Sequence, residues 1–201
     1  MNGIFKETDA RAFTLMELLM TIALGVILTA ILIPALNRGV KRARALQCVE
    51  NLRSIGMAVT QYAGENNGRL PEALSYGITT GDTIISSLAP YLGETKNPGK
   101  TWDCPANSGL RKVGFTGYVQ GNYATAFYFG HPQSGKPAYT LLQVHNFSSE
   151  KRWLLEDMDA WNYANSNVAN IAPKPVHQGG RNVLYVDGRV EWKPSTQGVI
   201  P

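Results

Sequence analysis

The sequence of 201 residues is poor in the groups that most enzymes and metal centres use. It has two cysteines and three histidines, and it contains no CxxC pair and no GxSxG, HExxH or phosphate-loop motif. Charged residues make up only 17% of the chain, and the net charge is +4. Because the histidines are well separated and no basic patch is interleaved with aromatics, these absences argue against catalysis and against nucleic-acid binding.

What the chain does have is a long apolar segment near its N-terminus. Residues 18–36 carry no charge, and as a helix they would extend roughly 28 Å, close to the hydrocarbon thickness of a bilayer. A polar stretch, residues 1–12, precedes the segment. Four bases follow it, in a place suited to lipid headgroups: Arg38, Lys41, Arg42 and Arg44. We therefore expect a leader at residues 1–12 and a single membrane-spanning helix at residues 13–36.

The apolar pattern continues beyond this segment at helical spacing. It includes Leu46, Val49, Leu52, Ile55 or Gly56, Val59 and Tyr62. A run of Gly and Asn at residues 64–68 then ends it. We interpret residues 37–64 as an amphipathic continuation of the same helix, with one face packed on a globular domain at residues 65–201.

The rest of the chain predicts a small antiparallel β-sheet with long loops, and therefore an α+β fold. Residues 123–129 and 152–155 are apolar, aromatic or β-branched runs typical of strands. Residues 182–186 and 189–193 predict a hairpin, because Asp187-Gly188 suits a two-residue turn. Short helical segments are expected within residues 82–92 and 141–144.

The N-terminal segment resembles a known signal. Residues 12–17 (Ala-Phe-Thr-Leu-Met-Glu), with the apolar residues that follow as far as Pro34, resemble the class III signal of type IV pilins and type II secretion pseudopilins. The resemblance implies a pilin-like fold, cleavage by prepilin peptidase between Ala12 and Phe13, and methylation of the new Phe13 amine. Ala12 stands where the family prefers Gly.

The resemblance also implies roles for two residues of the apolar helix. Glu17 would pair with the terminal amine of a neighbouring subunit, and Pro34 would kink the helix. Elementary physics supports both roles, because a carboxylate in lipid needs a partner and proline lacks a backbone N–H. The alternatives are that Glu17 reaches the membrane interface as an edge residue and that Pro34 ends the helix.

As implied by this resemblance, the chain is a structural subunit and not an enzyme. It would lie in the bacterial inner membrane with residues 65–201 in the periplasm, and it would later join a filament with copies of itself or related pseudopilins. Its other partners would be prepilin peptidase, an inner-membrane assembly platform and the lipid bilayer, and no cofactor would be required. The bases flanking the apolar segment predict the opposite orientation, since more of them follow it than precede it.

A second interpretation is a tethered periplasmic domain that binds a glycan or metal and does not polymerise. Trp161 and Tyr163 lie in a polar loop, where they would stack on a sugar or cover the core. Carboxylates at Asp157, Asp159 and Asp187 suit calcium. The alternative for Asp187 is a purely structural role in the turn with Gly188.

Two further features involve the domain at residues 65–201. Residues 177–190 resemble the C-terminal motif of a pseudopilin-like group, in which a His is followed after nine residues by Asp-Gly; here these are His177, Asp187 and Gly188. A structural His177 would hold the following Gly-Gly loop by a hydrogen bond. Cys48 and Cys104 would form a disulfide in an exported domain, or remain two buried thiols.

Overall fold

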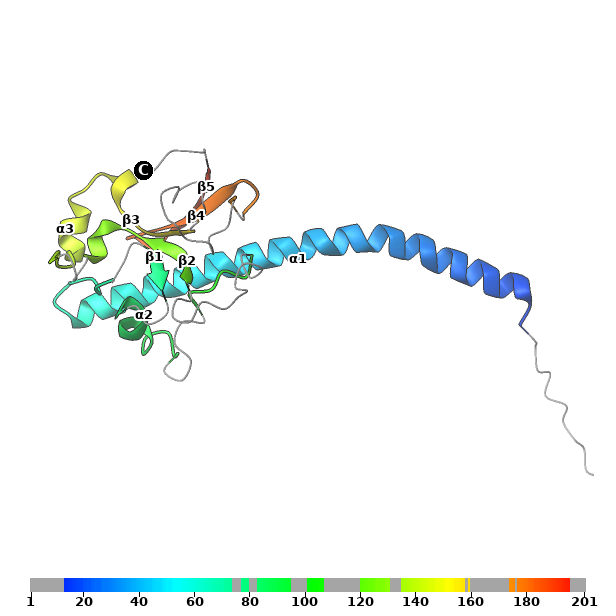
Figure 1. Ribbon diagram of the computed structural model, residues 1–201, viewed down its shortest axis with the longest axis horizontal. Helices are drawn as coiled ribbons and strands as arrows, with labels where there is room; N and C mark the ends of the chain where they lie inside the picture. Colours follow the sequence, from blue (N-terminus) through cyan, green and yellow to red (C-terminus); the bar gives the residue numbers. More distant parts are fainter. Residues whose placement is uncertain are drawn as a thin grey trace, which may run out of the picture. The chain divides into compact units, whose positions relative to one another are not determined.

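The computed structural model describes residues 13–73, 77–79, 83–94, 101–106, 120–130, 135–157, 159, 174–175 and 177–195. Its elements, in chain order, are α1 (Leu15–Glu65), β1 (Gly77–Thr79), α2 (Thr83–Leu88), β2 (Gln120–Thr125), η2 (Phe127–Phe129), α3 (Leu141–His145), η4 (Ser149–Lys151), β3 (Trp153–Asp157), β4 (Gly180–Tyr185) and β5 (Val190–Pro194) (Figure 1). The layout is α+β, with one long N-terminal helix and an antiparallel sheet.

A side-chain capping box begins α1, and a left-handed turn of the backbone ends it. At its start, Glu17 N donates to Thr14 Oγ1 at 3.2 Å and Thr14 N donates to Glu17 Oε2 at 3.0 Å, which is a capping box. At its end, Asn67 and Gly68 have φ angles of 56° and 75°, and Gly68 N donates to Ala63 O at 2.7 Å. This left-handed pair turns the chain out of the helix.

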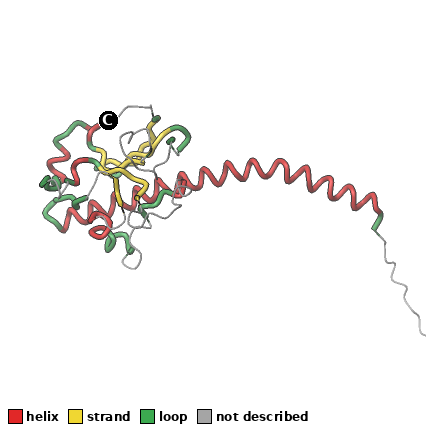
Figure 2. Tube along the Cα trace, in the orientation of Figure 1, coloured by secondary structure: helices red, strands yellow, loops and turns green. Residues whose placement is uncertain are grey.

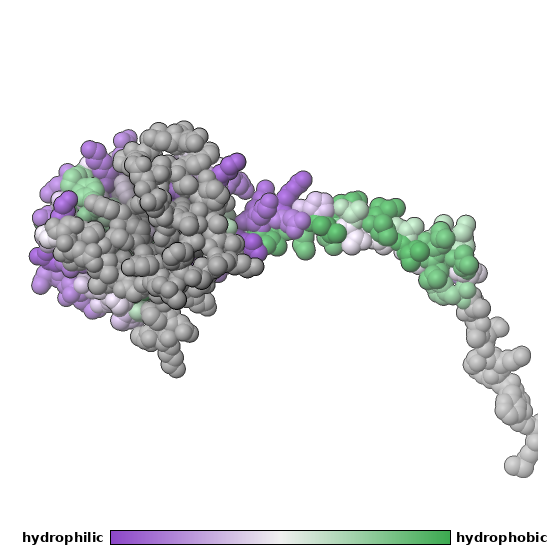
Figure 3. Space-filling model, viewed as in Figure 1, coloured by the Kyte–Doolittle hydropathy of each residue, from purple (hydrophilic) through white to green (hydrophobic). Residues whose placement is uncertain are grey.

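The helix belongs to two compact units, Met1–Lys41 and Arg42–Pro201. Within the first unit its apolar side chains are exposed, for example Leu15 at 80% and Leu36 at 62%, and Figure 3 colours this part of α1 mostly as hydrophobic. By length and composition this segment could cross a membrane, as an anchor or a signal sequence would. Pro34 lies inside the helix, which continues through it, so the alternative that Pro34 ends the helix is wrong.

The C-terminal half of α1 is one wall of the core of the second unit. Its buried stripe is made by Cys48, Leu52, Ile55, Gly56, Ala58, Val59 and Ala63. The expected continuation of the helix is confirmed, but Leu46 was wrongly assigned to the buried face and is 66% exposed. The stripe begins at Cys48 and continues at steps of three and four, and Leu46 lies outside this row. The packed domain therefore begins well before residue 65.

The sheet of the second unit is an antiparallel meander. Among the described residues its five strands have the order β1-β2-β3-β4-β5, and Figure 2 draws them beside the C-terminal part of α1. Leu184 on β4 packs on the helix, because a Cβ built on Gly56 would lie 3.0 Å from Leu184 Cδ1. A residue without a side chain at position 56 thus allows the helix to approach the sheet closely.

Three features of the sheet differ from what the sequence predicted. The strand expected at residues 123–129 ends at Thr125, and the chain turns through η2 to Gly130, whose φ is 68°. Strand β1 was not anticipated. The hairpin is confirmed, but its turn is not a two-residue one: Tyr185 N donates to Arg189 O at 2.9 Å around three residues, and of these only Gly188 has a positive φ. A three-residue loop with one left-handed glycine needs no positive φ at Asp187.

Candidate functional site

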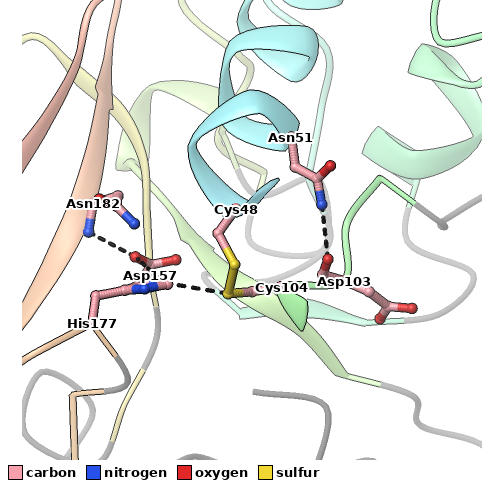
Figure 4. The surroundings of a disulfide bond; sticks show 7 residues. All are labelled: Cys48, Asn51, Asp103, Cys104, Asp157, His177 and Asn182. Carbon is pink, nitrogen blue, oxygen red and sulfur yellow. Dashed lines mark hydrogen bonds and ion pairs between the residues drawn. A yellow bond between two sulfur atoms is a disulfide. The ribbon is translucent and has the colours of Figure 1, made fainter. Parts of the chain in front are cut away.

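The candidate site lies where α1, the segment 101–106 and strands β3 and β4 meet. Cys48 on α1 and Cys104 in that segment form a disulfide with a Cα–Cα distance of 4.9 Å. Of the two alternatives that the sequence left open, the structure therefore has the disulfide. Next to it, Asn51 Nδ2 donates to Asp103 O at 2.8 Å, which fixes the segment to the helix a second time (Figure 4).

His177 lies against the disulfide and is 3% exposed. Its Nε2 is 3.3 Å from Cys104 Sγ and 3.2 Å from Asp157 Oδ2, as Figure 4 shows. Because a carboxylate and a bonded sulfur only accept hydrogen bonds, the proton is on Nε2. Asp157 Oδ2 also accepts from Asn182 N at 2.6 Å, so the carboxylate is held by a backbone donor as well as by the imidazole.

The backbone of His177 is anchored as firmly as its ring. Its carbonyl oxygen accepts from Trp192 Nε1 at 2.8 Å and from Gly180 N at 3.1 Å. The expected structural role, a hydrogen bond that holds the Gly-Gly loop, is thus found on the backbone, while the side chain points to the disulfide. Asn182 and Trp192 were not anticipated from the sequence, because their partners, Asp157 and His177, lie in another strand and in a loop.

The three aspartates considered for calcium have different surroundings. Asp187 lies in the exposed β4–β5 turn, where Arg189 Nε donates to its Oδ2 at 3.0 Å. Asp159 is 2% exposed, with its Oδ2 4.0 Å from Arg181 Nε, and Arg181 Nη1 is also 3.6 Å from Glu156 Oε2. In the described part of the chain these aspartates do not form a close ligand group. Asp187 is bound by the neighbouring arginine, and Asp157 faces the imidazole.

The described residues do contain one cluster with close ligand atoms. Cys48, Cys104 and His177 each offer one ligand atom, and these atoms all lie within 4.8 Å of one another.

Asp157 also affects Tyr123 on β2. Burial raises the pKa of the Tyr123 phenol well above its usual value, and the negative charge of Asp157 raises this pKa further.

A groove of about 400 Å³ lies next to this cluster within the second unit. Its lining includes Arg42, Leu46, Val49, His177, Asn182 and Trp192. Leu46 and Trp192 are 66% and 49% exposed, so the groove is apolar and open to solvent. Leu46 and Val49, which the amphipathic pattern had placed on the packed face of the helix, therefore line an open groove.

The remaining candidate residues lie at the start of the chain or outside the described residues. Phe13 is 74% exposed, and Glu17 Oε2 accepts from Thr14 Oγ1 at 2.9 Å as well as from the backbone. Ala12, Trp161 and Tyr163 lie outside the residues that the structure describes. No protein-family model matches the chain, and comparisons with curated proteins and with solved structures find no match either.

Proposed function

We propose that this chain is a structural subunit of a pilus-like filament, such as a type II secretion pseudopilus or a type IV pilus-like fibre. It would be assembled from the bacterial inner membrane after prepilin peptidase cuts between Ala12 and Phe13. Copies of the chain or related pseudopilins, an assembly platform and the bilayer would be its partners. No cofactor is needed for this role, and it is not enzymatic.

The proposal rests on the difference in environment between the two halves of α1. One helix of 51 residues has a C-terminal half built into a protein core and an N-terminal half whose apolar side chains are exposed. Exposed apolar surface of this length requires lipid or other helices around it. A subunit that moves from a bilayer into a helical bundle would use the same surface in both places.

Glu17 supports the assembly step. Its carboxylate caps its own helix through Thr14, so it is already oriented at the first turn. A charged group on an otherwise apolar helix is expensive in lipid unless it is paired. Cleavage before Phe13 would create an amine of opposite charge at the corresponding height of a neighbouring helix.

The disulfide supports the orientation of the chain. Disulfides form and persist in oxidising compartments such as the bacterial periplasm. The bond between Cys48 and Cys104 therefore favours a periplasmic second unit over the cytoplasmic orientation that the flanking bases predict.

A second candidate function is a tethered periplasmic domain that binds a ligand and does not polymerise. The open apolar groove beside Trp192 favours it, since such grooves are common binding sites. In this case the N-terminal half of α1 would be only an anchor, and the residue at position 17 would be unimportant for binding.

Substitution of Glu17 by Gln separates the two functions, because it removes the charge and keeps the size. The matched control is Glu50→Gln, a change at an exposed glutamate on the same helix. Assembly would be measured by crosslinking in membranes and by recovery of sheared filaments. We expect Glu17→Gln to reduce filament recovery more than about tenfold, with normal membrane insertion, and Glu50→Gln to assemble like the unchanged chain.

Mass spectrometry of the mature N-terminus provides the second measurement. The proposal requires a chain that begins at an N-methylated Phe13. A chain that keeps Met1, or that never crosslinks to another copy whatever the residue at position 17, would support the tethered domain instead.

A further inference from the structure

The disulfide, His177 and Asp157 together form a cluster of side chains that could bind a metal ion if the two sulfurs were not bonded to each other. Cys48 and Cys104 are 0% and 1% exposed, and His177 and Asp157 are 3% and 2% exposed. Together they present two sulfurs, one imidazole nitrogen and one carboxylate oxygen. Thiolate sulfur, imidazole nitrogen and carboxylate oxygen are the three kinds of donor that bind zinc in proteins.

Two distances within the cluster are close to the edges of a tetrahedron around a zinc ion. Zinc bonds of about 2.3 Å to sulfur and about 2.0–2.1 Å to nitrogen and oxygen imply edges of roughly 3.6 Å between sulfur and nitrogen and roughly 3.3 Å between nitrogen and oxygen. His177 Nε2 lies 3.3 Å from Cys104 Sγ and 3.2 Å from Asp157 Oδ2. Binding would require the two sulfurs to separate to roughly 3.8 Å after reduction. It would also require an Asp157 carboxylate oxygen to move toward them, because, among the described residues, the group of ligand atoms that lie within 4.8 Å of one another contains only Cys48, Cys104 and His177.

We propose that the dithiol form of the protein binds one zinc ion through Cys48, Cys104 and His177, with Asp157 as the fourth ligand. A dithiol reductant supplies two electrons and two protons, its own thiols become a disulfide, and Cys48 and Cys104 become thiols. Zinc then displaces one proton from each thiol. His177 binds through Nε2, and its proton moves to Nδ1.

Two further observations favour a ligand at this place. The site is rigidly supported, because Asp157 Oδ2 accepts a backbone hydrogen bond from Asn182 and the His177 carbonyl accepts from Trp192. Among the described residues, His177 Nδ1 is buried and has no hydrogen-bond partner, so it can take the proton that Nε2 must give up to bind a metal ion.

The consequence would be one cross-link with two chemical forms. Before oxidation, zinc would join α1 to the segment 101–106 through the same two residues that the disulfide joins afterwards. A partner disulfide that takes up two electrons and two protons to become a dithiol would oxidise the two thiolates to the Cys48–Cys104 bond and so release the ion. This inference does not depend on filament assembly and would hold equally for a tethered domain.

The test uses the full-length protein in detergent, reduced with a phosphine that is then removed under anaerobic conditions. Zinc is titrated in competition with a chromophoric chelator, and Co²⁺ replaces zinc in a second titration. We expect one metal ion per reduced chain, none per oxidised chain, and thiolate-to-cobalt charge-transfer absorption with the visible bands of a tetrahedral ion. The variant His177→Gln should lose more than about tenfold in affinity, since even residues behind a ligand contribute that much. The matched control His145→Gln, at an exposed histidine of α3, should bind like the unchanged chain.

A melting curve makes the test decisive if reduction weakens the fold. Zinc must then raise the melting temperature of the reduced protein and leave that of the oxidised protein unchanged. The proposal is overturned if the reduced chain binds no metal, if zinc fails to restore its melting transition, or if His177→Gln binds zinc as tightly as the unchanged chain.

Discussion

The indole of Trp192 lies directly over Gly180, so that a Cβ at position 180 would collide with Trp192 Cε2 and with the carbonyl oxygen of Lys193, 2.5 Å away. The two residues are on neighbouring strands, and the same indole donates to the carbonyl of His177. The glycine at the start of β4 therefore lets the hairpin close over the disulfide site.

The first prediction concerns this contact. Gly180→Ala should lower the free energy of unfolding by about 2 kcal/mol or more, because the added methyl group must push away a backbone carbonyl as well as the indole. Gly64→Ala is the matched control, since a Cβ there meets nothing within 4 Å and alanine favours the helix by about 0.5 kcal/mol. Urea unfolding measures both, and equal stabilities of the two variants would refute the packing argument.

The second prediction concerns the disulfide. Cys48 and Cys104 are 56 residues apart, and closing a loop of this length lowers the entropy of the unfolded chain by an amount equivalent to about 4 kcal/mol. Reductant without added metal should therefore lower the melting temperature of the protein markedly. The double variant Cys48→Ala/Cys104→Ala should melt at one temperature with or without reductant, and a reductant effect in that variant would place the sensitivity elsewhere.

The third prediction compares two arginines of the same hairpin. Arg181 is almost fully buried between Glu156 and Asp159, whereas Arg189 is exposed between Asp187 and Glu191. Removing one partner from a buried pair leaves uncompensated charge, so Arg181→Met should destabilise the protein by about 3 kcal/mol or more. Arg189→Met should change the stability by less than about 1 kcal/mol, because exposed pairs contribute little. Thermal unfolding of both variants at neutral pH tests the difference, and similar losses would contradict it.

The fourth prediction concerns alkaline pH. Burial, reinforced by the charge of Asp157, raises the pKa of Tyr123 well above its usual value of about 10. Above pH 10 the unfolded phenol ionises while the folded one keeps its proton, so the free energy of unfolding falls as the pH rises. Tyr123→Phe should remove about 1.4 kcal/mol per pH unit from that slope. Denaturation at pH 7 and pH 11 measures it, and a stability difference between the two proteins that is the same at both pH values would contradict the assignment.

Much of the architecture was accessible from local pattern. Residues 18–36 lack charge over a helical length, and the continuation of α1 follows from apolar spacing of three and four. The β4–β5 hairpin follows from a polar turn between apolar runs. Leu46 shows the limit of this reasoning, because apolar residues recur at the same spacing on more than one face of the helix. Only the packing of the helix in the folded domain shows that the buried face begins at Cys48 and leaves Leu46 exposed.

The candidate site was less accessible, since its parts are far apart in the chain. Asp157 and His177 were both singled out, yet nothing in their spacing indicated that they contact each other beside a disulfide. Asp187 fits a calcium ligand by type, but its turn places it beside Arg189. Residue type suggests what a side chain can bind, and the neighbours decide what it does bind.

By itself, the sequence determined the long helix, its apolar half and the α+β class, because charge, spacing and turn residues act over a few neighbouring positions. Only the tertiary structure decided that the two cysteines meet and that His177 and Asp157 stand beside them. Those contacts depend on how α1 packs against β3 and β4, and long-range packing is a sum over many weak contacts that no short segment of the chain contains.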